Sequence, residues 1–179
     1  LGTLDEYVSF STALRKGYQL FQGKPRPYVS GSVVTEDAIE FLRGAEKPFF
    51  CWAHYMDVHH PCYPPEPYRN AQDVDPEITV DTVGDLYPRF LNRPDTLTED
   101  EIDLLWRLYV AAIDYVSDQI ERLLDELAAN GTLEETMVIL TSDHGELFGE
   151  HGEYSKPERM YDELLEVPLV VTNAPPSVE

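Results

Sequence analysis

The stretch Thr136-Met137-Val138-Ile139-Leu140, with residues 141–152 directly after it, decides the fold of this chain. Its first part is a short apolar run typical of a buried strand. Asp143 and His144 follow at the carboxyl end of that strand, where open α/β sheets bind ligands. A carboxylate beside an imidazole predicts half of a divalent-metal site. The simpler alternative is a local turn held by the aspartate side chain.

The rest of the chain alternates between helical and strand patterns. Thr98 and Glu101 form a capping box at the start of a long amphipathic helix, which ends at Asn130-Gly131. This helix joins an apolar run at 49–55 to the strand at 136–140, so the two strands are expected to be parallel. Shorter helices are expected at 35–44 and 158–165, and a last strand at 167–172.

These elements predict an α/β fold with three αβα layers and a mostly parallel sheet. No linker divides the sequence, so residues 1–179 are expected to form a single domain. Residues 64–97 are rich in proline and polar side chains. We expect a loop or an insertion there, because long loops in compact domains are usually functional or mobile.

The charge balance limits the choice of partners. The chain holds 34 acidic residues against 13 lysines and arginines, for a net charge of −21. Such a surface repels nucleic acids and anionic membranes, so neither is expected as a partner. We interpret the acidity as adaptation to high salt, which screens self-repulsion. The alternative is an ordinary acidic protein, and a melting curve in molar salt separates the two. No membrane span or signal peptide is visible, which slightly favours the cytoplasm, but the chain begins at Leu1 and an upstream segment is expected.

Two blocks of sequence resemble a known family. Residues 141–152, with Lys156 and the strand at 167–171, closely resemble the metal-binding end of the sulfatases, which belong to the alkaline phosphatase superfamily. Residues 48–61 are similar to the strand of that family that carries a His-x-Pro element. The resemblance implies an alkaline-phosphatase-like α/β fold that is incomplete in this chain.

The resemblance also implies roles for four residues. Asp143 and His144 match ligands of one divalent metal ion, with Ca²⁺ expected first and Mn²⁺ or Mg²⁺ as alternatives. Lys156 matches a lysine that holds the anionic ester oxygens. His59 matches a histidine that assists the leaving oxygen. The implied substrate is a small anionic ester, a sulfate monoester.

Several parts of the family pattern are missing from these 179 residues. The formylglycine nucleophile, two further metal aspartates and the C-terminal domain have no counterpart. We therefore expect an internal fragment of a larger sulfatase catalytic domain, inactive by itself. The alternatives are a phosphodiesterase or phosphonate monoester hydrolase of the same superfamily, or a non-catalytic module that keeps the fold.

The remaining histidines and cysteines are given lesser roles. His60 is expected to be a bystander, His54 a core residue or one that supports the site from behind, and His151 a residue that orders its loop. Cys51 and Cys62 invite a zinc site with nearby histidines. Because side chains alternate along a strand, the two ends of Cys51-x-x-His54 would point to opposite faces, which disfavours zinc. The oligomeric state is left open.

Overall fold

The structure is a computed structural model that describes residues 20–21, 24–25 and 28–174. Most of the first 32 residues, expected to be an irregular outer segment, therefore lie outside the described residues. The described elements follow one another along the chain as β1 Leu20–Phe21, β2 Lys24–Pro25, α2 Gly31–Gly44, α3 Glu66–Ala71, α4 Val80–Asn92, α5 Glu99–Ala129, β3 Val138–Thr141, β4 Leu147–Phe148, β5 Tyr154–Ser155, α6 Asp162–Leu165 and β6 Leu169–Thr172. Short 3-10 turns lie at Pro94–Thr96, Leu133–Glu135 and Glu150–Gly152.

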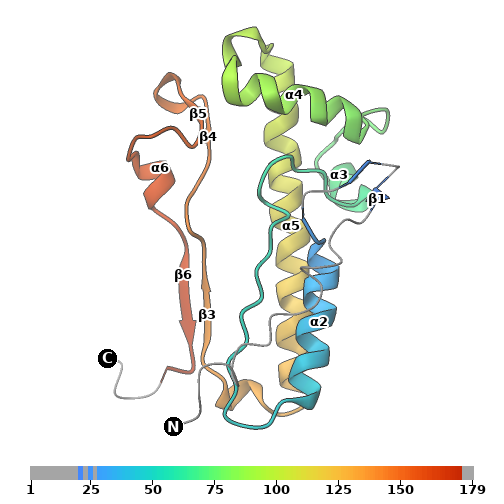
Figure 1. The fold of residues 1–179 in the computed structure, drawn as a ribbon, viewed down its shortest axis with the longest axis vertical. Helices are drawn as coiled ribbons and strands as arrows, with labels where there is room; N and C mark the ends of the chain where they lie inside the picture. Colours follow the sequence, from blue (N-terminus) through green and yellow to red (C-terminus); the bar gives the residue numbers. More distant parts are fainter. Residues whose placement is uncertain (1–19, 22–23, 26–27, 175–179) are drawn as a thin grey trace.

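Helix α5 runs the length of the molecule (Figure 1). It begins with the predicted capping box: Thr98 Oγ1 accepts the N–H of Glu101, and the Glu101 carboxylate accepts the N–H of Thr98 at 2.8 Å. These two bonds satisfy amides that have no partner inside the helix. At the other end, Gly131 has a φ of +73°, a left-handed conformation that glycine adopts without strain. Both predicted ends are therefore confirmed.

Helix α2 packs parallel to α5 along its lower half (Figure 1). The backbone N–H of Ser32 donates to the hydroxyl of Tyr115, and Arg43 pairs with Glu126 nearer the far end of both helices. The helix starts at Gly31, four residues before the start that the sequence predicts, where Thr35 was the expected N-cap. Thr35 is fully buried and its hydroxyl contacts the carbonyl of Gln119, so this side chain joins two helices instead of capping one.

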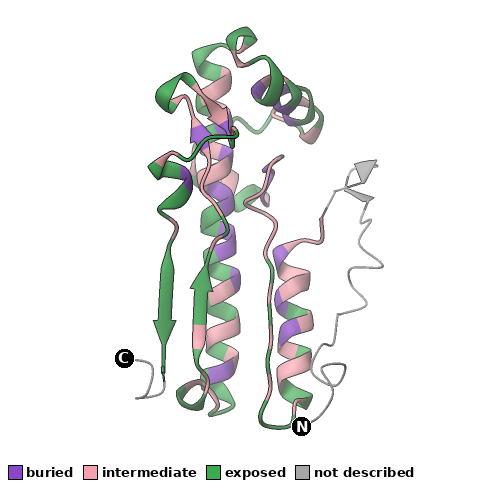
Figure 2. Ribbon diagram, turned by 60° about the vertical axis from the view of Figure 1, so that its left-hand side comes forward, coloured by how far each residue is buried: buried purple, intermediate pink, exposed green. Residues whose placement is uncertain are grey.

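The hydrophobic core lies where α4 and α5 meet. Its fully buried members include Val83, Phe90, Leu105 and Leu108. The segment around Cys62 and the β4–β5 hairpin close the same core, through Cys62, Phe148 and Tyr154. Figure 2 shows the buried residues as a stripe along α5 and on the inner side of α4. Most of the buried hydrophobic residues in the described part of the chain belong to this cluster.

The expectation of a loop at residues 64–97 is wrong, because α3 and α4 lie there. Pro65 is the residue before α3 and Pro67 falls in its first turn, positions at which a missing N–H costs little. Thr79 caps α4 by accepting the N–H of Thr82. Prolines thus lie at the start of α3, and α4 also contains a proline inside the helix, Pro88. Whether the segment is an insertion stays a prediction.

Strands β3 and β6 form a two-stranded antiparallel ribbon, with Val138 opposite Thr172 and Thr141 opposite Leu169. Both strands fall where the sequence predicts them. The pairings of β1 with β2 and of β4 with β5 are also antiparallel. The mostly parallel sheet is therefore not found among residues 20–21, 24–25 and 28–174, because the ladders there join strands that run in opposite directions.

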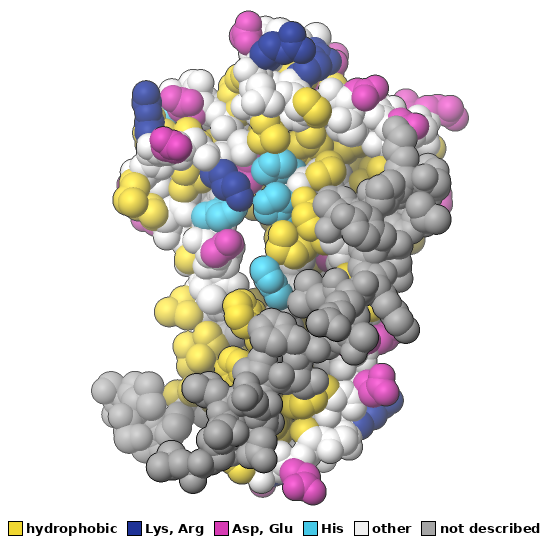
Figure 3. Space-filling model, viewed as in Figure 1, with side chains coloured by type: hydrophobic (Ala, Val, Ile, Leu, Met, Phe, Trp, Pro, Cys, Tyr) yellow, Lys and Arg dark blue, Asp and Glu magenta, His cyan; other side chains and the backbone are white. Residues whose placement is uncertain are grey.

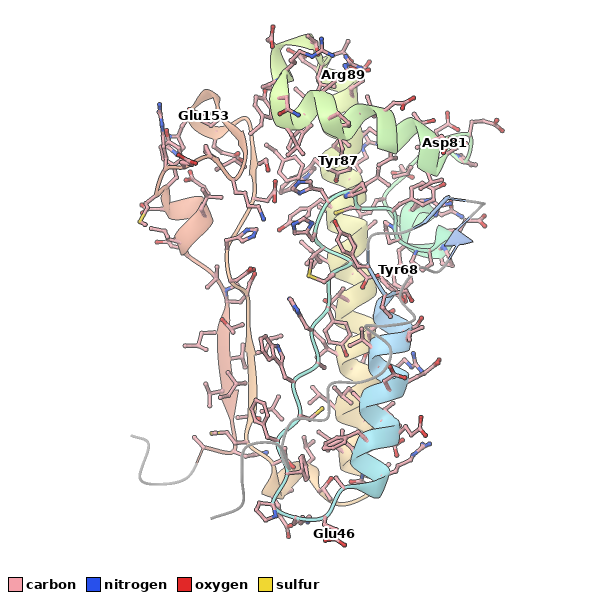
Figure 4. All side chains as sticks on the ribbon, viewed as in Figure 1. Glu46, Tyr68, Asp81, Tyr87, Arg89 and Glu153 are labelled. Carbon is pink, nitrogen blue, oxygen red and sulfur yellow. The ribbon has the colours of Figure 1, made fainter. Side chains whose placement is uncertain are left out.

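Residues 49–55 were expected to form a strand and do not pair with one. The segment is extended and runs in the same direction as β3, from the end that holds Glu46 toward the end that holds Arg89 (Figure 4). Its even-numbered residues are exposed, with Phe50 at 68% and Trp52 at 75%. The predicted direction is correct and the predicted strand is wrong, because no described strand lies within hydrogen-bonding distance of it. In the described part of the chain, no helix is both long and apolar enough to cross a membrane.

Candidate active site

The residues after β3 are held against α6 by the backbone of Gly145. Its N–H donates to the carbonyl of Leu164 at 3.0 Å. A Cβ at this position would lie 2.0 Å from the carbonyl oxygen of Glu163, so only glycine fits this approach. Gly149, four residues later, has a φ of +127° and turns the chain into β5. The two glycines therefore place His144 and Lys156, on either side of this turn, close to one another.

The imidazole of His144 has a defined orientation. Its Nδ1 lies 2.7 Å from the carbonyl oxygen of Gly145, and a carbonyl can only accept a hydrogen bond. Nδ1 therefore carries the proton, and the lone pair of Nε2 faces the ammonium of Lys156 at 3.0 Å. A local backbone contact of this kind is a common way to fix the tautomer of a functional histidine.

Lys156 joins the two halves of the site. Its Nζ also lies 3.4 Å from Nε2 of His59, which belongs to the segment that follows residues 49–55. Figure 3 shows a basic side chain (dark blue) beside histidine side chains (cyan) at a hollow between the β4–β5–α6 region and the helical region. The predicted residues His59, His144 and Lys156 are thus brought together from three separate segments.

Asp143 lies at the edge of this group. Its side chain is 84% exposed, and Oδ1 accepts the backbone N–H of its neighbour His144. Its Oδ2 lies 3.8 Å from Nε2 of His144, so one ion could contact both. The donor types suit a divalent cation. Among the described residues, however, no group of three or more His, Cys, Asp or Glu side chains could hold a metal ion.

His59 is held from behind by Tyr28. Its backbone N–H closes a turn with the carbonyl of Met56, and its Nδ1 lies 2.8 Å from the hydroxyl of Tyr28. The Tyr28 hydroxyl also contacts the carbonyl oxygen of His60. Burial raises the pKa of Tyr28 to about 12, so the hydroxyl stays protonated. Tyr28 was not singled out in the sequence, because a lone tyrosine 31 positions away gives no signal.

His60 is more than a bystander in position. Its ring stacks on His59 at 4.6 Å and on Tyr87 at 5.3 Å between centroids. Burial lowers the pKa of His60 to about 4, and the cations of the site act in the same direction. Its Nδ1 lies 3.8 Å from the carboxylate of Glu146, which is also almost buried. Burial raises the pKa of Glu146, so a second polar pair lies directly beneath the candidate site.

The other two histidines, His54 and His151, lie outside the candidate site and differ in their contacts. His151 pairs with the carboxylate of Glu163 at 3.0 Å and stacks on Tyr161, which agrees with a role in ordering the loop. His54 was expected in the core and is exposed, stacked on Trp52. That expectation is wrong because residues 49–55 are not covered on this side. Burial raises the pKa of both Cys51 and Cys62, to about 12 for Cys62, so neither thiol favours the thiolate that zinc binds.

Three comparisons place the chain among known proteins. Residues 5–175 match the family model described as Sulfatase. The uncharacterized sulfatase YidJ of Escherichia coli is 30% identical over 159 residues, 77% of this chain and 30% of that protein. The multifunctional alkaline phosphatase superfamily protein PehA of Trinickia caryophylli is 28% identical over 174 residues, 84% of this chain and 34% of that protein.

A solved structure shows the same fold. The crystal structure of the putative sulfatase yidJ from Bacteroides fragilis superimposes with a TM-score of 0.61 at 22% identity, over 82% of this chain and 31% of that one. The alkaline-phosphatase-like α/β fold is therefore confirmed in part of its extent. The chain spans 30% and 34% of the lengths of the two curated relatives named above. The family model matches residues 5–175, which is nearly the whole of this chain, so the chain belongs to the sulfatase family.

Proposed function

We propose that this chain is the part of a metal-dependent sulfuric ester hydrolase that carries half of the metal site and the groups that bind the ester. One observation carries the proposal: Nζ of Lys156 lies 3.0 Å from Nε2 of His144 and 3.4 Å from Nε2 of His59. The ammonium can hold an anionic ester oxygen, and the imidazoles beside it can bind a metal ion or exchange a proton. The match to the Sulfatase family model supports a sulfate ester as the substrate.

In this proposal Asp143 and His144 hold one divalent metal ion, Ca²⁺ first, with Mn²⁺ or Mg²⁺ as alternatives. The exposed carboxylate of Asp143 can turn toward an ion at Nε2 of His144. In this proposal the ammonium of Lys156 moves from its 3.0 Å contact with Nε2 to the ester oxygens when the ion binds. When bound, the metal would polarise the ester oxygens. Two ligands make a weak site, and we expect further oxygen ligands and the formylglycine nucleophile to come from outside these residues.

Lys156 and His59 bind the substrate. The ammonium of Lys156 neutralises the charge of the ester oxygens, and it lies where it can reach an anion placed beside His144. His59 presents Nε2 to the same space, from which it can exchange a proton with the leaving oxygen. Because the nucleophile is expected elsewhere, the 179-residue chain by itself should not hydrolyse an aryl sulfate.

Calorimetric titration of Ca²⁺, Mg²⁺ and Mn²⁺ into this chain tests the metal half of the proposal. Binding in the millimolar range is expected, and Asp143→Ala should weaken it at least tenfold by removing the only carboxylate of the pair. Asp125→Ala is the matched control, since it removes an exposed aspartate from the outer face of α5. Equal binding by all three proteins would contradict the assignment of Asp143.

A second candidate is a phosphodiesterase or phosphonate monoester hydrolase on the same scaffold. The similarity to PehA and the imidazole beside Asp143 favour it, because an imidazole suits a transition metal better than Ca²⁺. Aryl sulfate and aryl phosphodiester turnover by the full-length parent separates the two candidates. Faster sulfate turnover supports the first candidate, and faster phosphodiester turnover supports the second.

A further inference from the structure

Tyr28 contacts the site from a segment that sequence reasoning left unassigned. Its hydroxyl lies 2.8 Å from Nδ1 of His59 and within hydrogen-bonding distance of the His60 carbonyl. The two rings meet edge to face, with centroids 5.4 Å apart. Tyr28 thus restrains the position of the His59 ring. It contacts Nδ1, so Nε2 is the ring nitrogen that faces Lys156.

The proton on the His59 ring can be placed by counting donors. The ammonium of Lys156 has three donors and no lone pair, so Nε2 of His59, 3.4 Å away, must accept. The single proton of the neutral imidazole therefore lies on Nδ1. That N–H needs an acceptor, and two oxygens are near it: the Tyr28 hydroxyl at 2.8 Å and the His60 carbonyl at 2.9 Å.

The direction of the Tyr28 hydroxyl follows from the same count. The carbonyl of His60 can only accept, so the Tyr28 O–H points to it. The lone pairs of the hydroxyl oxygen are then available to the Nδ1–H of His59. The chain of bonds runs from His59 through Tyr28 to the backbone, with each donor matched to one acceptor.

We infer that Tyr28 is a positioning residue that holds His59 in its Nδ1-protonated tautomer, with the lone pair of Nε2 directed at Lys156 and the bound ester. The tautomer is inferred from the distances alone, and its role in catalysis rests on the proposed function. When Nε2 takes up a proton from water, the ring becomes an imidazolium whose Nδ1–H already has an acceptor, and Nε2 can pass that proton to the leaving oxygen. His59 would present the correct nitrogen to the leaving oxygen without turning its ring.

The tautomer can be read directly from the imidazole ¹⁵N shifts of His59 in this chain, at a pH at which the ring is neutral. In the wild type, Nδ1 should show the shift of a protonated nitrogen and Nε2 that of an unprotonated one. Tyr28→Phe keeps the ring and removes the hydroxyl acceptor, which leaves the His60 carbonyl as the other oxygen near Nδ1. The ratio of the Nδ1-protonated to the Nε2-protonated form of His59 should then fall about fivefold to tenfold, which corresponds to the net free energy of one ordinary hydrogen bond.

Tyr68→Phe is the matched control, because it removes a hydroxyl that bonds Asp118 on the exposed side of α5. It should leave the His59 shifts unchanged, and circular dichroism should show both variants folded. A wild-type His59 protonated on Nε2, or an unchanged tautomer ratio in folded Tyr28→Phe, would overturn the inference. Neither result depends on metal binding or turnover, so the proposed function can fail or hold separately.

Discussion

The helical region and the β3–β6 ribbon contain similar apolar side chains, which are buried in the helical region and exposed in the ribbon. In α5, Leu105 and Leu108 are fully buried against α4 and the residues around Cys62. In β6, Leu169 is 68% exposed, and Val170 and Val171 are close to half exposed (Figure 2). Apolar sequence therefore predicts which residues would gain from burial. Burial itself requires a second layer of structure, which the helices have and the ribbon, among the described residues, lacks.

The candidate site bridges these two regions. His59 lies on the helical side, where Tyr28, His60 and Tyr87 pack around it. His144 and Lys156 lie beyond the ribbon, on the turn and hairpin that follow β3. The helical side is held by a packed core, and the other side by backbone hydrogen bonds and by the contact of the β4–β5 hairpin with that core. We therefore expect substitutions in the two regions to change the free energy of unfolding by different amounts, with different signs and with a different dependence on pH.

The largest difference is expected between two leucine substitutions. Leu108→Ala removes a fully buried side chain, which should lower the free energy of unfolding by about 2–5 kcal/mol. Leu169→Ala removes the same atoms from an exposed position and should cost less than about 1 kcal/mol. Urea denaturation of both variants measures the contrast. Equal losses would mean that the ribbon is covered in solution and that the comparison is wrong.

Two glycine substitutions should differ in sign. Gly145→Ala would push a Cβ into the carbonyl of Glu163, which should lower the free energy of unfolding by about 1–3 kcal/mol. Gly84→Ala in α4 meets nothing within 4 Å and should raise it by up to about 1 kcal/mol through helix propensity. Thermal melts of the two variants measure both signs. Stabilisation by Gly145→Ala would show that the turn beside His144 is looser than described.

The smallest of these effects concerns pH. The folded-state pKa of His60, about 4, lies below the unfolded value of 6.5, so the unfolded chain binds more protons between these values. Stability from His60 is then complete above pH 6.5 and is lost as the pH falls toward 4. With a discount for solvent reaching the ring, the loss is about 1 kcal/mol.

His60→Phe keeps the stacked ring and removes the titrating group, so it should lose less stability than the wild type between pH 7 and pH 5. The groups that face His60 are the imidazoles of His59 and His144, the ammonium of Lys156 and the carboxylate of Glu146. Urea midpoints at the two pH values measure the difference, with the exposed His151→Phe as control. An acid loss in His60→Phe as large as in the wild type would assign it to another group.

Local signals in the sequence predicted the elements that depend on local contacts. The capping box of Thr98, the stop at Gly131 and the positions of β3 and β6 needed only neighbouring residues. The 49–55 strand failed because pairing depends on a partner that local sequence does not specify. Helices α3 and α4 lie in a proline-rich segment whose composition predicts a loop, although Thr79, which caps α4 through the N–H of Thr82, is a local signal for a helix start.

The site shows the same division. Asp143, His144, Lys156 and His59 could be chosen from the sequence by motif, and the structure places three of them within hydrogen-bonding distance. Which atoms face each other could not be predicted, because the tautomers depend on the backbone of Gly145 and on Tyr28. The buried pair of His60 and Glu146 was also missed, since burial at this point arises from α4 packing over it.

The most direct measurement of the central claim, that one site joins the two regions, is the imidazole ¹⁵N spectrum of Lys156→Met. Lys156 is the residue that contacts both His59 and His144. Its loss should shift the Nε2 signals of both histidines, while His54 and His151, which lie elsewhere, keep theirs. A shift of only one signal, or of neither, would contradict the account, because His59 and His144 would then not share a site.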